Sequence, residues 1–501
     1  MFGLTKLEIP LKKEELSLDN IVEYLPSVVN AFIDNANKVH ANYEIYKGAH
    51  KVLAKERPYG DDSHINNKVV DQYLWEMVNF KCGYIYGNPL EFAEKGTEKT
   101  DEMKAFNNYL VESDFRGKMD SVAEWVYATG VGYLFVEPQK GEVPFKTIFL
   151  SSDRAAKVYS SYLDGEPLFD LIVTPIKKQV DSDFVDYYIL SIYTADRYYE
   201  FEYNIGLAQA NPQPTAGGDR VGNKPLPLIE FYAYRDKIGI VESCVAVQDA
   251  LDSLDSASVD NIEDFVNQML IILNASLGET ADDQSTNFKL AKKNGVMVLF
   301  DPNKDQKADV KTITLQLNNS DVNALKNQLK ADMFGAWGVP LAGSSISSGN
   351  VTQGGAEASN GWENAYNVAL KENNNMSGGI NEFVRKVLWI CSATPDDPIK
   401  TLKLTDFDIK FNIARSNNLQ VKTQSFSNLV EHNVPSDIAW ATCELSGDPV
   451  AIGKKIEEYA AEKAKLAVQT AQAQTGNNSK NADTITGDSE VDGKTQKTTV
   501  E

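Results

Sequence analysis

Residues 241–275 read VESCVAVQDALDSLDSASVDNIEDFVNQMLIILNA. Apolar residues recur here at helical spacing, so the sequence predicts one long helix, which at about 1.5 Å per residue would span roughly 50 Å. The apolar stripe consists of Val247, Leu251, Leu254, Val259, Ile262, Val266, Met269 and Leu273. Residues 242–264 contain seven acidic residues and no Lys or Arg. Like charges on one helix repel each other, so either a basic neighbour or an acidic surface is expected.

The residues before this helix predict further helices followed by an antiparallel sheet. Apolar spacing indicates helices over residues 17–56, from Ile65 to about Gly83, and over residues 101–129. Pro26 is expected to kink or interrupt the first of them. From Gly132 to Asp236, short runs of Tyr, Phe, Ile and Val alternate with turns, which predicts strands. Residues 211–227 read as a Gly- and Pro-rich loop, and the whole block as an α+β domain.

The residues after the long helix predict a small unit, a second helix and an uncharged loop. Residues 276–317 hold strand-like runs among turns. Ser320 is a candidate N-cap for a helix that ends near Trp337. Residues 338–356 contain five glycines, four serines and no charged residue. A loop of this length inside a compact domain is uncommon unless it is functional or disordered.

The C-terminal part predicts more helices and a polar tail. A long helix is expected over residues 357–390, with a kink at Gly378 and Gly379. A smaller region follows Pro398, with a strand near Phe407 and helices up to Gln474. Residues 476–501 are polar and contain no aromatic residue, so we expect this tail to be disordered.

Composition excludes several classes of protein. The 501-residue chain has a net charge of −22, which argues against binding nucleic acid over a broad surface by counterion release. Its four cysteines lie far apart in the sequence and favour buried, reduced thiols over disulfides or a zinc site. The sequence has neither the apolar run of about 18 residues that a membrane helix needs nor a signal-peptide pattern, so a soluble protein is expected.

Enzyme motifs find no support in the sequence. The Gly-Lys-Thr at residues 493–495 lacks a glycine at the spacing of a phosphate-binding loop, and Gly130 and Gly132 lack the third glycine of a dinucleotide fingerprint. The four histidines have no metal-binding spacing, and no G-x-S-x-G motif occurs. We therefore expect neither enzymatic activity nor a cofactor nor a metal.

The order of these elements resembles the portal proteins of long-tailed bacteriophages. Short motifs carry the resemblance over residues 17–470. They are Asn66–Val70 leading to Lys81–Pro89, Pro227–Phe231, Asp249 to Leu254, Asp260–Phe265, Gly338–Pro340, Val434–Ser436, Asp448–Pro449 and Ile456–Glu458. The resemblance implies a portal-type, mainly helical α+β fold and a ring of typically twelve identical subunits.

By this resemblance the chain divides into the named parts of a portal subunit. The implied parts are a wing of helices and antiparallel sheet (17–240) with a long wing helix (357–400), two stem helices (241–275 and 320–336), an α/β clip (276–317), a tunnel loop (338–356), a helical crown (401–474) and a disordered tail (476–501).

The resemblance also implies a function and partners. Portal rings occupy one capsid vertex of the virion, assemble in the bacterial cytoplasm, and form the channel for DNA packaging and ejection. The implied partners are further copies of the chain, double-stranded DNA bound without sequence specificity, the terminase large subunit, the major capsid and scaffolding proteins, and a head-completion or adaptor protein. An acidic channel wall would repel phosphates and let the duplex slide.

Three groups of residues are candidates for these contacts. Hydroxyl and amide groups of the tunnel loop could exchange hydrogen bonds with phosphates: Ser344, Ser345, Ser347, Ser348 and Asn350. Lys326 and Lys330, one helical turn apart, could pair with the acidic stem helix at Asp252, Asp255 and Asp260, face the channel, or form a solvated surface. Clip lysines could face a motor or neck protein, although a solvated surface is the simpler interpretation: Lys289, Lys292 and Lys293.

Two other classes of protein remain as alternatives. One is a head–tail connector or minor capsid protein without a role in packaging, although such proteins are usually smaller and lack a helix–clip–helix unit. The other, less favoured, is a soluble enzyme with a mobile lid at residues 338–356. Ring formation by the purified chain distinguishes the portal from a monomeric enzyme.

Overall fold

The computed structural model describes residues 3–56, 66–95, 99–180, 183–204, 212–219, 225–266, 269–273, 280, 282–283, 285–286, 309–313, 319–341, 361–411, 413, 419–443, 452–453, 455–463 and 465. The chain divides into two compact units, Met1–Arg415 and Ser416–Glu501, and each is described by itself.

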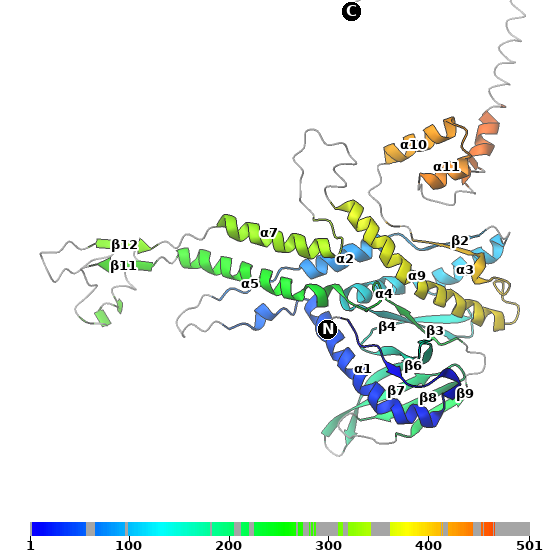
Figure 1. Ribbon diagram of the computed structural model, residues 1–501, viewed down its shortest axis with the longest axis horizontal. Coiled ribbons are helices and arrows are strands. Elements are labelled where there is room, and N and C mark those ends of the chain that lie inside the picture. The colour runs from blue at the N-terminus through cyan, green and yellow to red at the C-terminus, as the bar shows by residue number, and fades with distance from the viewer. Residues whose placement is uncertain are drawn as a thin grey trace, which may run out of the picture. The chain divides into compact units, whose positions relative to one another are not determined.

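The expected mixture of helices and strands is confirmed (Figure 1). The helices of the first unit are α1 (Leu18–Tyr46), α2 (Tyr73–Tyr86), α3 (Thr100–Glu112), α4 (Phe115–Thr129), α5 (Ile240–Val266), α7 (Asn319–Ala336) and α9 (Trp362–Ala393), with short 3-10 helices η1 (Lys13–Glu15), η2 (Lys51–Ala54) and η3 (Leu404–Asp406).

The strands that the structure describes form two larger sheets and two ribbons. The six-stranded sheet has the order β1 (Glu8–Ile9), β5 (Ala155–Ser160), β6 (Pro167–Val180), β7 (Asp183–Tyr193), β8 (Arg197–Tyr203), β9 (Pro214–Asp219). The three-stranded sheet has the order β10 (Leu228–Phe231), β3 (Gly132–Pro138), β4 (Phe145–Leu150). The ribbons pair β11 (Met269–Leu273) with β12 (Asp309–Ile313), and β13 (Phe407–Lys410) with β2 (Glu91–Glu94). All pairings are antiparallel except that of β1 with β5.

Helix α1 packs on the six-stranded sheet through a buried apolar stripe. Its members have the spacing that the sequence predicts: Ile21, Leu25, Val28, Val29 and Phe32. They meet Val158, Leu171 and Phe201 of the sheet. The helix runs through Pro26 without ending, because burying five apolar side chains outweighs the roughly 3 kcal/mol that an interior proline costs. It ends at Tyr46, short of the predicted residue 56.

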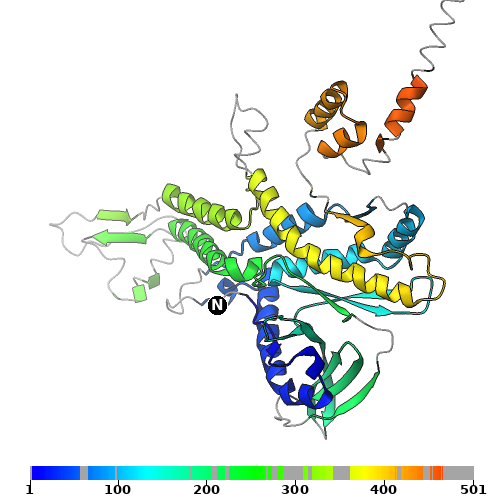
Figure 2. The ribbon, with the colours of Figure 1, turned by 45° about the vertical axis from the view of Figure 1, so that its right-hand side comes forward.

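Helix α9 lies along the three-stranded sheet and closes the main core (Figure 2). Its Phe383 stacks on Phe115 of α4 with 4.5 Å between ring centroids. One turn of this helix also carries a buried carboxylate, Glu372, whose Oε1 accepts hydrogen bonds from Lys81 Nζ at 2.9 Å and Tyr234 OH at 2.9 Å. Removing one member of such a buried pair costs about 3–5 kcal/mol, so the Lys81–Glu372 pair fixes α9 against α2.

Three predicted helices are wrong in extent. Residues 66–72 are not helical, and α2 begins only at Tyr73. The helix predicted over residues 101–129 is two helices, which meet where Asp114 takes a left-handed conformation with φ of 50°. The long helix α5 ends at Val266, and Met269–Leu273 forms strand β11. A five-residue apolar run fits either element, and here the pairing with Asp309–Ile313 makes it a strand.

Other boundaries also differ from the prediction. Residues 214–219, expected in a loop, form the edge strand β9. Ser320 lies in the first turn of α7 instead of preceding it. Residues 401–415 belong to the first unit and not to the C-terminal one, because β13 pairs with β2 and Phe407 packs on Phe106 with 4.9 Å between ring centroids.

Helices α5 and α7 lie side by side and lead at the same end to the β11–β12 ribbon (Figure 1). The predicted helix–small unit–helix arrangement therefore has a counterpart in the structure. Most residues of the predicted clip, 276–317, lie outside the described residues.

The second unit contains α10 (Leu419–Glu431) and α11 (Ser436–Thr442). Phe426 of α10 meets Trp440 of α11 edge-on, with 5.4 Å between ring centroids. Helices were expected in both places. The tail, residues 476–501, lies outside the described residues.

The two adjacent glycines of α9 differ in their surroundings. A Cβ atom at Gly379 would lie 2.6 Å from Phe231 Cδ1 and 2.8 Å from the carbonyl oxygen of Glu230. A Cβ atom at Gly378 would have no such neighbour within 4 Å. Gly379 therefore permits the close approach of α9 to β10, a role that the sequence pattern did not suggest.

We predict that Gly379→Ala lowers the free energy of unfolding by about 1–3 kcal/mol, because the added methyl group overpacks the contact with β10. Gly378→Ala is the matched control and should leave stability unchanged or raise it by up to about 1 kcal/mol through helix propensity. Urea denaturation of both variants measures the difference. Equal stabilities would contradict the close-contact argument.

Candidate functional site

Helices α5 and α7 carry the predicted site residues that the structure describes. Asp252, Asp255 and Asp260 lie on α5, and Lys326 and Lys330 lie on α7. The other predicted residues lie outside the described residues: Ser344, Ser345, Ser347, Ser348 and Asn350 of the predicted tunnel loop, and Lys289, Lys292 and Lys293 of the predicted clip. Their roles stay predictions.

Lys326 connects the two helices. Its Nζ lies 2.5 Å from Asp255 Oδ2 on α5 and 3.7 Å from Asp71 Oδ2, which precedes α2. Burial alone would lower the pKa of Lys326, but the hydrogen bond to Asp255 and the charge of Asp71 raise it above its ordinary value. The amine is therefore held in its charged form between two carboxyl groups.

Lys330 has a different environment, although it is only one helical turn away. Its Nζ lies 4.3 Å from the centroid of the Tyr73 ring and 5.3 Å from that of Phe334. Such cation–π contacts are worth about 0.5–1 kcal/mol at exposed sites. Of the two predicted lysines, the structure thus brings only Lys326 together with an acidic residue of α5.

The extended segment 66–72, here called the strap, lies along α5. Three of its backbone N–H groups, at alternate residues, donate hydrogen bonds to side chains four residues apart on the helix. The bonds run from Asn67 N to Asp260 Oδ1 at 2.8 Å, from Val69 N to Ser256 Oγ at 3.0 Å, and from Asp71 N to Asp252 Oδ1 at 3.0 Å. Gln248 Nε2 completes the series by donating to the carbonyl oxygen of Asp71 at 2.7 Å.

The two repeats match in length. Two residues of an extended chain advance about 6.6 Å, and four residues of an α-helix advance about 6.0 Å. Side chains at positions 252, 256 and 260 therefore stay in register with the N–H groups at 71, 69 and 67, running in the opposite direction. The buried face of this half of α5 is consequently polar instead of apolar.

Asp252 is one of the two most enclosed members of this face, with Gln248. It is fully buried, and its Oδ2 lies 2.5 Å from Nδ1 of His50, which is buried as well. A proton therefore lies between the two atoms. Its Oδ1 accepts a second hydrogen bond from Gln248 Nε2 at 2.8 Å. A buried carboxylate with three donors avoids most of the penalty of leaving water.

Two more acidic residues of α5 have basic partners within the chain. Lys38 Nζ lies 2.5 Å from Glu242 Oε1, and Lys51 Nζ lies 2.7 Å from Asp249 Oδ2. With the contacts of Asp252, Asp255 and Asp260, five of the seven acidic side chains expected on this helix have partners. The sequence left two explanations for these acidic residues, a basic neighbour or an acidic surface. Basic neighbours explain four of them: Glu242, Asp249, Asp252 and Asp255.

Sequence reasoning missed the strap, His50, Lys38 and Lys51. Val69 and Tyr73 have helical spacing, and this spacing concealed an extended segment. The signal that could have revealed it is the four-residue repeat Gln248, Asp252, Ser256 and Asp260, because a polar stripe on a long helix needs hydrogen-bonding partners.

The apolar stripe predicted on α5 is only partly buried. Leu251 is fully buried, but Val259 is 39% exposed and Ile262 is 65% exposed. Leu325 on α7 is 50% exposed. Three large apolar side chains on neighbouring helices thus remain accessible to solvent in the single chain.

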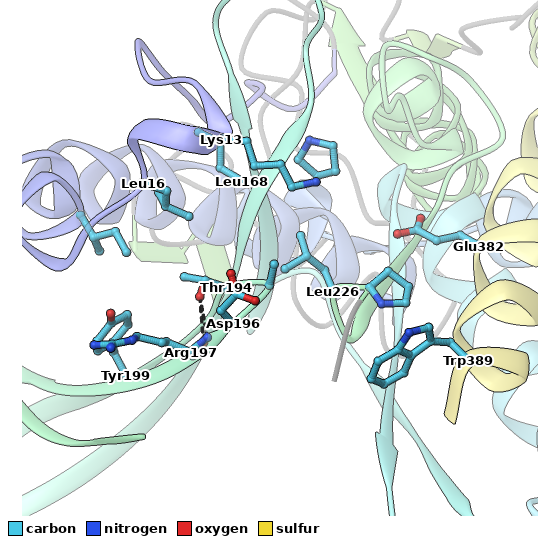
Figure 3. Close-up of a pocket in the computed structure, with 14 residues that line it drawn as sticks. Lys13, Leu16, Leu168, Thr194, Asp196, Arg197, Tyr199, Leu226, Glu382 and Trp389 are labelled. Carbon is cyan, nitrogen blue, oxygen red and sulfur yellow. Dashed lines mark hydrogen bonds between the residues drawn. The ribbon is translucent and has the colours of Figure 1, made fainter. Parts of the chain in front are cut away.

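A separate cleft of about 630 Å³ lies between the N-terminal part of the chain, the turn between β7 and β8, and α9 (Figure 3). Charged and apolar side chains both line this cleft, and its labelled lining includes Lys13, Asp196, Arg197, Glu382, Leu16, Leu168, Leu226 and Trp389. Lys157 Nζ holds Glu382 Oε1 at 2.6 Å. None of the candidate site residues predicted from the sequence is among the described residues that line the cleft.

The remaining sequence predictions concern cysteines, metals and membranes. Cys82, Cys244, Cys391 and Cys443 are buried and free, as expected. Burial raises the pKa of the Cys82, Cys244 and Cys391 thiols, so they resist ionisation. Within the ranges that the structure describes, no group of three or more His, Cys, Asp or Glu is placed to hold a metal, and every helix is too short or too polar to cross a bilayer.

Comparison with known families decides the family. The family model described as "Phage portal protein, SPP1 Gp6-like" matches residues 28–467. The chain belongs to this family of phage portal proteins. The portal protein of Bacillus phage SPP1 is 22% identical over 237 residues, which are 46% of this chain and 46% of that protein. The chain thus matches about half the length of this curated relative.

Two solved structures are also similar to this portal-family chain. The neck of an empty gene transfer agent (GTA) particle, computed with C6 symmetry, gives a TM-score of 0.45 at 13% identity, covering 75% of this chain and 90% of that one. The virion of a native GTA particle gives a TM-score of 0.43 at 13% identity, with the same coverage.

Two of the motifs that resemble portal proteins meet at the strap. Asn66–Val70 forms most of the strap, and Asp260 opens the second motif, Asp260–Phe265. Asn67 donates both its backbone N–H and its Nδ2 to the same oxygen of Asp260, at 2.8 and 2.9 Å. The two motifs, which are far apart in the sequence, thus contact each other in the structure.

We predict that Ser256→Ala lowers the free energy of unfolding by about 1–3 kcal/mol, because the N–H group of Val69 loses its acceptor. Ser258→Ala is the matched control. Both serines donate to the carbonyl oxygen four residues earlier, but among the described residues Ser258 hydrogen-bonds to Leu254 alone and does not contact the strap. The control should change stability by less than about 0.5 kcal/mol. Urea denaturation measures the stability of both variants, and hydrogen exchange measures the protection of the Val69 amide. Equal stability and equal protection in the two variants would contradict the contact between Ser256 and the strap.

Proposed function

We propose that this chain forms a closed ring, of twelve subunits, that serves as the portal of a tailed bacteriophage at one vertex of the capsid. The observation that carries the proposal is the family match, which spans α5, the β11–β12 ribbon, α7 and the uncharged residues 338–356. In this proposal α5 and α7 are the stem, the ribbon belongs to the clip, and residues 338–356 face the channel.

The exposed apolar side chains of α5 and α7 support assembly into a ring. A ring requires a head-to-tail interface between two different surfaces of the same subunit. Val259, Ile262 and Leu325 project from neighbouring helices and are open to solvent in the single subunit. Contact with the adjacent subunit would remove them from water.

The electrostatic part of the proposal differs from the one that the sequence suggested. Four acidic side chains of α5 lie beside a basic side chain of the same subunit, so most of the charge of this helix is compensated before it could face a channel. The net charge of each chain is −22, and every subunit of the ring would carry it. This overall charge would repel DNA phosphates more than the acidic residues of α5 would. The duplex would pass without sequence-specific contacts.

The proposed partners follow from this role. The ring would bind the terminase large subunit during packaging and a head-completion or adaptor protein afterwards, and it would contact the major capsid and scaffolding proteins during assembly in the host cytoplasm. The portal family is structural, and ATP hydrolysis would belong to the docked terminase. The chain itself would act as a conduit and not as an enzyme.

We predict that the purified chain forms rings with a central hole in negative-stain electron microscopy. Twelve copies of the 55.4 kDa chain give a mass of about 665 kDa, which mass photometry or light scattering can measure. A uniform population of monomers at high concentration, or rings without a central hole, would contradict the proposal.

We predict that Ile262→Ser reduces the fraction of chain in rings at a given concentration by tenfold or more while leaving the melting temperature of the subunit unchanged, because Ile262 is exposed in the single subunit. The control is Leu163→Ser, another exposed apolar residue, in the turn between β5 and β6. Sedimentation velocity measures the ring fraction. Equal ring fractions for the two variants would exclude this face of α5 from the interface.

A further inference from the structure

Asp71 occupies an unusual place at the end of the strap. Its backbone is fixed on both sides, with its N–H bound to Asp252 and its carbonyl oxygen bound to Gln248. Its side chain points between α5 and α7, where Oδ2 is buried and has no hydrogen-bond partner within the described structure. The nearest cation is Lys326 Nζ, at 3.7 Å, which is too far for a hydrogen bond.

The neighbour of this oxygen is the carboxyl group of Asp255. Lys326 brings the two acidic side chains together, because its Nζ lies 2.5 Å from Asp255 Oδ2 and 3.7 Å from Asp71 Oδ2. A side-chain hydrogen bond between the two carboxyl groups contributes to the pKa of each. Two carboxylates this close repel each other, whereas a carboxylic acid beside a carboxylate forms a strong O–H···O hydrogen bond. A proton on Asp71 would supply the partner that its Oδ2 lacks.

We propose that Asp71 and Asp255 share one proton, and that this proton fastens the strap to the α5–α7 helix pair, so that the attachment loosens as the pH rises. The attachment of the strap, which directly precedes α2, to the two long helices therefore depends on pH. The proposal does not depend on ring assembly.

The groups around Asp71 support this assignment. Helix α5 contributes the carboxylates Asp252 and Asp255, and α7 contributes the ammonium group of Lys326. Helix α2 contributes Tyr73, a neutral phenol whose ring faces Lys330, and His50 beside η2 reaches the site only through Asp252. Acidic groups therefore outnumber the cations that directly face Asp71.

The direction of the pKa shifts agrees with a shared proton. Burial first, and then the hydrogen bond and charge of Asp255, raise the pKa of Asp71 from 3.8 to about 6, although Lys326 acts against the increase. Burial alone would raise the pKa of Asp255, but the hydrogen bonds from Asp71 and Lys326 lower it below its ordinary value. The proton therefore resides on Asp71, and Asp255 is the acceptor.

The sign of the pH dependence follows. A carboxyl group whose pKa is higher in the folded state stabilises that state when it is protonated, and this stabilisation is lost as the pH rises through about 6. The lowered pKa of Asp255 has the opposite effect, and its stabilisation is lost at pH values below 3.8. The strap is therefore held most firmly near pH 4, and its attachment weakens as the pH rises from there to about 6 and stays weak at neutral pH.

Hydrogen exchange of the full-length chain at pH 5 and pH 8 tests the proposal. After correction for intrinsic exchange rates, protection of the amides of Asn67, Val69 and Asp71 should fall by about tenfold between the two pH values. In Asp71→Asn the side-chain amide can donate to Asp255 at any pH, so protection should stay high and change less than threefold.

Two further variants keep the test decisive. Asp101→Asn removes an exposed carboxylate elsewhere and should behave like the wild type. Lys326→Met removes the cation that lowers the pKa of Asp71, so the midpoint of the wild-type transition should move to higher pH. Unchanged wild-type protection, loss of protection in Asp71→Asn equal to that of the wild type, or a midpoint that moves to lower pH in Lys326→Met would overturn the proposal.

Discussion

The polar face of α5 can be buried only where a second segment supplies hydrogen bonds at the matching repeat. Side chains at 252, 256 and 260 accept hydrogen bonds, and only an extended chain presents N–H groups at nearly the same spacing. This requirement fixes the register of the strap, and with it the start of α2 at Tyr73. It also places His50 and Asp71 beside α5, where Asp71 meets α7 through Lys326.

Apolar and polar contacts contribute differently to the fold of the first unit. Apolar stripes, such as that of α1 on the six-stranded sheet, provide most of the burial and tolerate small shifts. Buried polar groups tolerate almost none, because a displaced partner leaves a charge or an N–H group without compensation. Glu372 with Lys81, and Asp252 with His50, therefore determine where the long helices α9 and α5 lie relative to the N-terminal helices.

Much of the fold could be predicted from periodicity, and the errors have physical causes. The apolar stripe of α1 and the strands predicted in β6 and β7 are confirmed. The stripe of α1 buries one face of the helix, whereas consecutive residues of β6 are buried on both faces of its sheet. The run Met269–Leu273 was assigned to a helix because five apolar residues fit both periods, and only its long-range pairing decides. The strap was missed because its partners are polar side chains distant in the sequence. The family emerged from short motifs, two of which form the contact of Asn67 with Asp260.

The buried thiols have a practical consequence for observing this chain at work. All four cysteines are shielded by the fold, so maleimide dyes would find few reactive sulfurs on the folded wild type. A single cysteine introduced at a solvent-exposed position, such as 163, would then carry the fluorophore without prior removal of native cysteines. Stepwise photobleaching of single labelled particles would then count the copies of the chain in each particle, with all native core residues kept.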